Sequence, residues 1–446
     1  MAPVISYNAS SGSDTAASGA GPAVAITGSG AAHTSGVAST TIQLTNSPDL
    51  SGVATDGSAA IWLNTPSGSR HLSKITAVDD GADTVTVEDS FNIASGGSAV
   101  DYAIGGERAS LVNDTDRPDW EDILTGWVFE FAEGVYDNGS LSMAASSSEI
   151  FTFKAVDDYS TRPIIRSSAS YVFVVNGADH VACVGLYFDH TNDTSGYCGY
   201  IASGGDGCRF EDCYFKSSGL SSFLSAFRVN TGTDSVFFGC VFDGGDESLV
   251  NTGSGFHLSS GRGYLQFADC VFKNAGSHLF YTSPTSLTAH AFARCIFHNG
   301  GGDGIHFAGS NLYGLSVSQC TIYGVSGAGI LALYSNSHAV LISDCIISEC
   351  GGYGIDTITQ VGGIVTNCVI HNCTSGVNNT SETDTSAVFR NIITDDPELT
   401  DPENGDFTLG STSAAIGAGT AGQDVGYWPS AGGGGGGASG TRVSVF

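Results

Sequence analysis

The chain has 446 residues with 45 acidic and 15 basic side chains, and its net charge of −30 includes no basic cluster. This charge argues against nucleic acid and anionic membranes as partners. No stretch approaches the roughly 20 apolar residues of a membrane span, and the N-terminus lacks the basic and apolar regions of a signal peptide, so we expect neither membrane insertion nor secretion.

The first part of the chain changes character near residue 39. Residues 1–38 are rich in Ala, Gly, Ser and Thr, which predicts a low-complexity, extended N-terminal segment. Residues 39–106 contain short alternating strands separated by turns, with a hairpin between Val78 and Val85, and they predict a small β domain. Strand-like stretches between residues 107 and 185 open a longer β structure, and the polar residues 107–120 are expected to cap its first coil.

One short phrase then returns with a cysteine at its centre, as in EDCYF at 211–215 and ARCIF at 293–297. Successive cysteines of this phrase lie 23 to 30 residues apart. We call them the anchor cysteines: Cys213, Cys240, Cys270, Cys295, Cys320, Cys345 and Cys368. A fixed period of this length predicts a solenoid, in which each coil buries its apolar face against its neighbours.

The pattern inside one period identifies the type of solenoid. Apolar residues alternate on both sides of the anchor, and the residue just before it is mostly Gly, Asp or Asn, as in Gly239, Asp344 and Asn367. This predicts two strands joined at a left-handed corner. A third strand follows about ten residues later, for example at Gly304-Ile305. The fold expected for residues 107–428 is therefore an all-β, right-handed, single-stranded parallel β-helix with a C-terminal cap, followed by a glycine-rich tail at 429–446.

The anchor cysteines are expected to stack in the core as small hydrophobic residues and to remain free thiols. The spacings Cys345-x4-Cys350 and Cys368-x4-Cys373 could also suggest zinc ligands. The repeat already accounts for these spacings, however, so we expect no metal and no cofactor.

The outward positions of the third strand form one file along the coils. By alternation this file contains Arg228, His257, Tyr281, His306, Leu331, Asp356 and Asn378. Aromatic and planar hydrogen-bonding groups in a row suit a glycan-binding face, for which we select Arg228, His257, Tyr281, His306 and Asp356. A solvent-exposed polar face without a ligand is the alternative interpretation.

Catalytic residues are harder to find. Glycoside hydrolysis needs two carboxyl groups about 5–9.5 Å apart. If the chain is an enzyme, the best candidates are Asp246, Glu247, Asp303 and His306, but two coils of rise separate Glu247 from Asp303. Loop acids are common in a chain with 45 of them, so the residues favour a non-enzymatic role over an enzymatic one.

The repeat phrases and the Gly- and Asp-rich stretch at 395–426 resemble the right-handed parallel β-helix repeat proteins of the pectate-lyase-like superfamily. The overall arrangement is similar to spike and fibre proteins of tailed bacteriophages. This resemblance implies a homotrimer that is assembled in the host cytoplasm, is part of the virion, and contacts other virion proteins through residues 1–106. It also implies that the β-helix projects outward to recognise a host-surface polysaccharide, which some members of that family cleave, whereas the residues of this chain favour recognition without cleavage. A polysaccharide depolymerase of the hydrolase or lyase class and a capsid decoration protein are the alternatives; the calcium-binding aspartates and basic catalyst of the lyases have no counterpart cluster in this sequence.

Overall fold

The structure is a computed structural model that describes residues 4–7, 26–33, 39–44, 48–55, 59–64, 70–91, 100–104, 128–137, 141–143, 151–156, 162–177, 179–191, 196–203, 205–217, 225–230, 234–245, 254–258, 264–282, 288–308, 312–332, 340–357, 363–378 and 388–426. Within these ranges no helix has the length and apolar character needed to cross a bilayer. The chain divides into two compact units, one of residues 1–167 with 174–187 and the other of residues 168–173 with 188–446.

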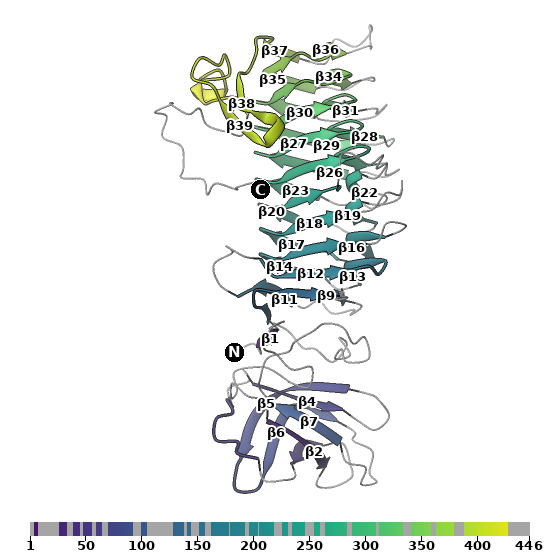
Figure 1. The fold of residues 1–446 in the computed structure, drawn as a ribbon, viewed down its shortest axis with the longest axis vertical. Coiled ribbons are helices and arrows are strands. Elements are labelled where there is room, and N and C mark those ends of the chain that lie inside the picture. The colour runs from purple at the N-terminus through teal and green to yellow at the C-terminus, as the bar shows by residue number, and fades with distance from the viewer. Residues whose placement is uncertain are drawn as a thin grey trace. The chain divides into compact units, whose positions relative to one another are not determined.

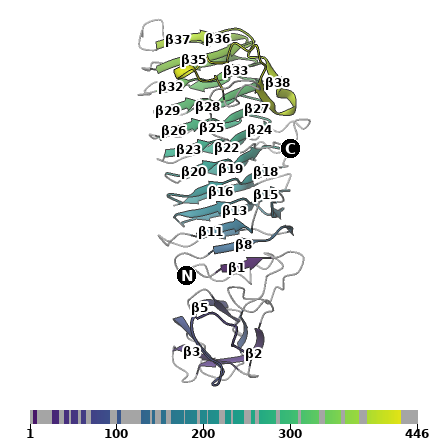
Figure 2. The ribbon, with the colours of Figure 1, turned by 90° about the vertical axis from the view of Figure 1, so that its left-hand side faces the viewer.

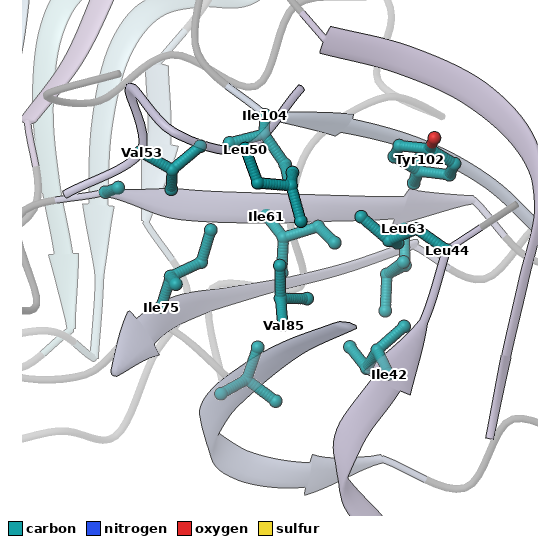
Figure 3. Packing of buried hydrophobic residues seen from close by; sticks show 12 residues of the cluster. Ile42, Leu44, Leu50, Val53, Ile61, Leu63, Ile75, Val85, Tyr102 and Ile104 are labelled. Atoms are coloured by element: carbon teal, nitrogen blue, oxygen red, sulfur yellow. The ribbon is translucent and has the colours of Figure 1, made fainter. Parts of the chain in front are cut away.

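The first unit contains a closed antiparallel barrel with the strand order β2-β3-β6-β5-β4-β7. Its strands are β2 (Ile26–His33), β3 (Ser39–Gln43), β4 (Ala60–Asn64), β5 (Arg70–Asp79), β6 (Thr84–Phe91) and β7 (Val100–Ile104). Strands β5 and β6 form the predicted hairpin, in which Asp79 pairs with Thr84. The alternating apolar residues of these strands fill the interior, where Ile42, Ile61 and Val85 are fully buried (Figure 3).

Residues 4–7 and 26–33, the described parts of the N-terminal 38 residues, differ from the expected extended segment. Strand β2 belongs to the barrel, so this domain begins near residue 26 and not at residue 39. Strand β1 (Val4–Tyr7) pairs in parallel with β8 (Val128–Phe131), a strand of the first coils. The alanine- and glycine-rich composition concealed both strands because neither has a regular apolar alternation.

The first coils of the β-helix lie in the same unit. Strand β8 pairs in parallel with β11 (Phe151–Ala155), which in turn pairs with β14 (Val181–Val184), and β9 (Val135–Asp137) pairs with β12 (Ile164–Ser167). The other strands of this region are β10 (Leu141–Met143), β13 (Tyr171–Asn176) and β15 (Tyr187–His190). The expected cap at residues 107–120 and the glycine-rich tail lie outside the described residues.

The second unit repeats a coil of three strands, and Figures 1 and 2 show the coils stacked in parallel. The first strands are β17 (Arg209–Glu211), β20 (Val236–Phe238), β23 (Tyr264–Ala268), β26 (Thr288–Ala293), β29 (Leu312–Ser318) and β32 (Val340–Ser343). The second strands are β18 (Tyr214–Ser217), β21 (Val241–Asp243), β24 (Val271–Ala275), β27 (Ile296–Gly300), β30 (Thr321–Val325) and β33 (Ile346–Ser348). Strand β35 (Gly363–His371) runs through both positions, and β37 (Val388–Ile393) pairs with it.

The third strands form a separate parallel sheet in the order β16-β19-β22-β25-β28-β31-β34-β36. Their bounds are β16 (Tyr197–Ser203), β19 (Ser225–Val229), β22 (Ser254–Leu258), β25 (Phe280–Thr282), β28 (Ile305–Phe307), β31 (Ile330–Ala332), β34 (Tyr353–Thr357) and β36 (Ser375–Asn378). The predicted all-β parallel β-helix with a small β domain before it is confirmed.

The corner before each anchor is left-handed, as the sequence predicts. Every residue at this position has a positive φ, including the unfavourable Arg294 (52°) and Gln319 (53°). Asp269 and Arg294 form two hydrogen bonds of 2.8 and 2.6 Å across adjacent corners. A second left-handed corner, four residues after the anchor, occurs at Asn274, Asn299, Gly324, Glu349 and Asn372.

Aromatic stacks fill the interior of the coils. Phe210, Phe237, Phe267 and Phe292 stack along the first strands with ring centroids 4.8 to 5.0 Å apart and nearly parallel planes. This distance is the spacing of neighbouring strands, so each ring lies on the ring of the next coil. All seven anchor cysteines are fully buried free thiols beside these stacks.

The C-terminal segment after β37 packs along the second strands, so the expected cap lies on the side of the coils (Figure 1). It contains β38 (Leu399–Asp401), the 3-10 turn η3 (Pro402–Asn404), β39 (Asp406–Leu409) and the 3-10 turn η4 (Thr420–Gly422). Phe407 packs on Val241, Val271 and Ile296, which are outward apolar residues of three coils. The C-terminal segment therefore covers the second-strand side and leaves the third-strand sheet as the candidate face for a ligand.

Candidate functional site

The third-strand sheet places the predicted outward residues in one file. The strand register pairs Arg228 with His257, His257 with Tyr281, and Tyr281 with His306. It then continues through Leu331 and Asp356 to Asn378. The file is thus continuous in the backbone, although an aliphatic residue at Leu331 interrupts its chemistry.

The two ends of this file differ. Arg228, His257, Tyr281 and His306 are partly exposed. Asp356 is only 6% exposed, so its carboxylate offers little surface to a ligand, contrary to the expectation for this residue. The face that can contact a ligand therefore lies on the coils before β31.

Three tyrosines extend the face toward the N-terminal end of the second unit. Tyr200 is in register with Arg228, and its ring stacks on Tyr171 at 4.9 Å with an angle of 13° between the planes. The Arg228 guanidinium lies 4.8 Å from the centre of the Tyr197 ring and donates a hydrogen bond to the Tyr197 hydroxyl. Burial lowers the pKa of Arg228 from its usual value and raises that of Tyr200. Sequence reasoning missed these tyrosines, although applying the same alternation to the preceding coil identifies Tyr200.

The centre of the face is a stack of rings. The centroid of Tyr281 lies 5.2 Å from those of His257 and His306, and the His278 ring stacks on it at 5.3 Å. Burial, reinforced by the charge of Arg228, lowers the pKa of His257 to about 4. His257 is therefore a neutral ring at pH 7 and joins the stack without a charge to desolvate.

Asp303 has three close partners on this face. Its Oδ2 lies 2.6 Å from Nδ1 of His306 and 3.1 Å from Nδ1 of His278, while its Oδ1 accepts a hydrogen bond of 2.6 Å from the Ala328 amide. Burial alone would raise the pKa of Asp303, but the hydrogen bonds from His278, His306 and Ala328 outweigh it and hold this pKa well below its ordinary value. Asp303 is consequently a carboxylate throughout the neutral range.

Glycines make room for this cluster. A Cβ atom on Gly327 would lie 2.2 Å from Asp303 Oδ1, and one on Gly302 would lie 2.9 Å from His278 Nδ1. Both clashes are closer than real Cβ contacts, so a side chain at either position would displace a member of the cluster. The glycine-rich turn at 300–304 is thus part of how the sequence builds the site.

Of the four candidate catalytic residues, two lie close together and two lie outside the described residues. Asp303 and His306 are joined by a hydrogen bond. Asp246 and Glu247, which follow β21, lie outside the described residues. His278 was missed as a partner of Asp303, although it precedes Asp303 by 25 residues, the same spacing as between Cys270 and Cys295.

The comparisons with known proteins agree with this fold. The family described as "Right handed beta helix region" matches residues 171–338 and 303–398, together more than half of the chain. The protein therefore belongs to the right-handed β-helix family. The comparison with curated proteins found no match.

Solved structures of similar fold have low sequence identity to this chain. A pectate lyase, Pel9A, is 15% identical with a TM-score of 0.49, covering 70% of this chain and 90% of its own. The tailspike protein gp49 from Pseudomonas phage LKA1 is 12% identical with a TM-score of 0.27, covering 84% of this chain and 64% of its own. The catalytic domain of a GH87 alpha-1,3-glucanase is 10% identical with a TM-score of 0.32, covering 84% and 89%.

Proposed function

We propose that this protein binds an extended glycan along its third-strand sheet, between the tyrosines of the first coils and the cluster around Asp303. The observation that carries this proposal is the continuous file of Arg228, His257, Tyr281 and His306, one side chain per coil. Successive coils lie about 4.8 Å apart, so the file presents regularly spaced rings and donors to a chain molecule.

The chemistry of the file matches a sugar polymer. Tyr281 and the tyrosines at 171, 197 and 200 are partly exposed aromatic side chains against which sugar rings can pack. Arg228 and the histidines supply donors and acceptors for hydroxyl groups. The net charge of −30 repels polyanions, so the ligand that fits best is a neutral polysaccharide.

Calorimetric titration with purified neutral surface polysaccharides, cut to oligosaccharides of several sugars, tests this proposal. Tyr281→Ala removes the central ring and is expected to weaken binding at least about fivefold, since a buried aromatic anchor contributes more than about 1 kcal/mol. Tyr264→Ala is the matched control, because Tyr264 is an exposed tyrosine of β23, a first strand, outside the file. Equal losses in both variants, or no loss in either, would exclude the third-strand sheet as the binding face.

We infer further that this binding serves a phage particle as a homotrimeric spike or fibre, attached to other virion proteins through residues 1–106. The support is the order of the parts, a small β-barrel domain before a long β-helix, which is similar to virion proteins of tailed phages. Immunogold labelling of particles and the solution mass relative to the 45.5 kDa chain are the measurements. Label on the tail and a trimer mass support this role; label over the head indicates decoration, and no label on particles contradicts a virion role.

A depolymerase is the second candidate, and one observation favours it. Asp303 holds Nδ1 of His306 in a hydrogen bond of 2.6 Å, an arrangement that orients a histidine to exchange protons with a substrate through its other nitrogen. Incubation with the bound polysaccharide, followed by assays for new reducing ends and for unsaturated sugar products, tests it. Cleavage that Asp303→Asn abolishes would establish the enzyme, whereas intact polymer supports binding alone.

A further inference from the structure

The side chains of His278, Asp303 and His306 form a cluster whose geometry suits a metal ion, in addition to any role in glycan binding. The potential ligand atoms of these three side chains all lie within 4.8 Å of one another. All three side chains are between 10% and 22% exposed, so they are mostly shielded from water yet open on one side. Two strands and the turns before them, in adjacent coils, hold them in place.

In the absence of a cation, Nδ1 of His278 cannot form good hydrogen bonds with both of its neighbours. Nδ1 of His278 lies 3.0 Å from the backbone nitrogen of Asp303 and 3.1 Å from the carboxylate oxygen Oδ2. If Nδ1 is unprotonated, its single lone pair accepts the backbone N–H, and no proton lies between Nδ1 and the nearby carboxylate oxygen. If Nδ1 is protonated, it places its own N–H against the backbone N–H. A cation between Nδ1 and Oδ2 resolves this conflict, because it takes the Nδ1 lone pair in place of the Asp303 N–H while Oδ2 supplies a second ligand atom.

We propose that His278, Asp303 and His306 bind one divalent transition-metal ion of the zinc type. Two imidazole nitrogens with one carboxylate oxygen form a borderline donor set that favours zinc over calcium or magnesium, which prefer oxygen ligands alone. Ligand atoms around tetrahedral zinc lie about 3.3 Å apart, given bonds of about 2.0–2.1 Å. The 3.1 Å distance to His278 already fits, and the 2.6 Å distance to His306 has to open slightly as that ring shifts its proton to Nε2.

The surrounding contacts suit a metal site. The Ala328 amide binds Oδ1 of Asp303 and leaves Oδ2 free to face both histidines, as outer partners orient ligating carboxylates in metal sites. Three protein ligands leave at least one coordination position for water or for a hydroxyl of a bound sugar. The metal ion would thus lie at one end of the glycan face, next to Tyr281.

Equilibrium dialysis of the full chain without a polyhistidine tag, against zinc and in the absence of any glycan, tests this proposal. We expect one zinc ion per chain, and no binding of calcium or magnesium at the same site. Asp303→Asn and His306→Gln are each expected to weaken zinc binding about 10–100-fold or more, since removing even an outer partner has an effect of that size. His257→Ala is the matched control, because it removes a histidine of the same file that is not part of the cluster.

The outcomes separate this proposal from glycan binding. Zinc retained by both cluster variants, or less than one tenth of an ion bound by the wild-type chain, overturns the metal site and leaves glycan binding untouched. Zinc lost by the control as well as by the variants also contradicts it, because binding then depends on histidines elsewhere. Circular dichroism of every variant shows whether the fold persists, and His278→Gln supplies a third variant if one of the others does not fold.

Discussion

His290 allows a test of how much a buried polar side chain in the core of the coils lowers the stability of the protein. It points inward from β26 between Leu265 and Leu315, which occupy the same position in the neighbouring coils. It is 1% exposed, and neither ring nitrogen has a hydrogen-bond partner among the described residues. The rings of Phe280 and Phe307 contact it, with centroids 5.9 and 5.8 Å from its own. Leucine at this position would complete the aliphatic file.

The size of the effect follows from burial. Burial lowers the pKa of His290 to about 3, whereas an unfolded histidine has a pKa of about 6.5. Between these values the unfolded chain binds a proton that the folded chain does not, so stability falls as the pH drops from 6.5 toward 3. At about 1.4 kcal/mol per pKa unit, this one group removes about 2–3 kcal/mol between pH 7 and pH 4.5. His290→Leu removes that loss, and it adds about 1–3 kcal/mol at pH 7 because an unsatisfied buried group is gone.

Urea unfolding of the wild-type chain and His290→Leu at pH 7 and pH 4.5 measures both effects. The variant is expected to be the more stable at pH 7, and its advantage is expected to grow by about 2–3 kcal/mol at pH 4.5. An advantage that is the same at both pH values would show that His290 does not titrate as a buried group. A less stable variant at pH 7 would show that the ring has hydrogen-bond partners in the folded protein.

Three further predictions concern other parts of the fold. Gly327→Ala places a methyl group against Asp303 and is expected to abolish zinc binding; it also lowers the melting temperature, because the displaced Asp303 leaves the buried Ala328 amide without its acceptor, as metal titration and thermal unfolding can check. Asp344→Asn weakens the hydrogen bonds of 2.7 and 2.9 Å that Thr420 donates to the Asp344 carboxylate. Hydrogen exchange at the Thr420 and Gly426 amides is expected to become about tenfold faster or more. Unchanged exchange would contradict the attachment of the C-terminal segment through Asp344. Thiol labelling of the native chain is expected to reach Cys373, the only one of the twelve cysteines that is not fully buried, well before the others; rapid labelling of several cysteines would contradict the buried stack.

The coil could be predicted from the sequence because its conformational requirements are local and recur in every repeat. A corner residue must adopt a positive φ, and Gly, Asp and Asn do so at low energy, so their recurrence before the anchors marked each corner. Arg294 and Gln319 occupy the same conformation at a higher cost, and only the surrounding repeat predicted them. The N-terminal strands β1 and β2 have no such repeat, and their partners are distant in the sequence. Composition alone therefore assigned them to an extended segment.

The outward file was predictable for the same reason, whereas its chemistry was only partly so. Alternation gave Arg228, His257, Tyr281 and His306 their common face, but it could not show that Asp356 is covered. His278 lies in a turn outside the strand alternation, so the alternation does not identify it. Its contact with Asp303 depends on the stacking of two turns, which bring residues 25 positions apart next to each other.

The location of the cluster follows from what a solenoid constrains and what it leaves free. Inward positions mostly repeat the residue type of the coils above and below, as the phenylalanine stacks do, and a departure such as His290 buries a polar group without a hydrogen-bond partner among the described residues. Turn and outward positions carry no such requirement. In the next coil, Ala328 takes the position of Asp303 and Leu331 takes that of His306, and the backbone pairing does not change. The polar cluster is therefore a local substitution on a regular scaffold. Gly302 and Gly327 make room for it.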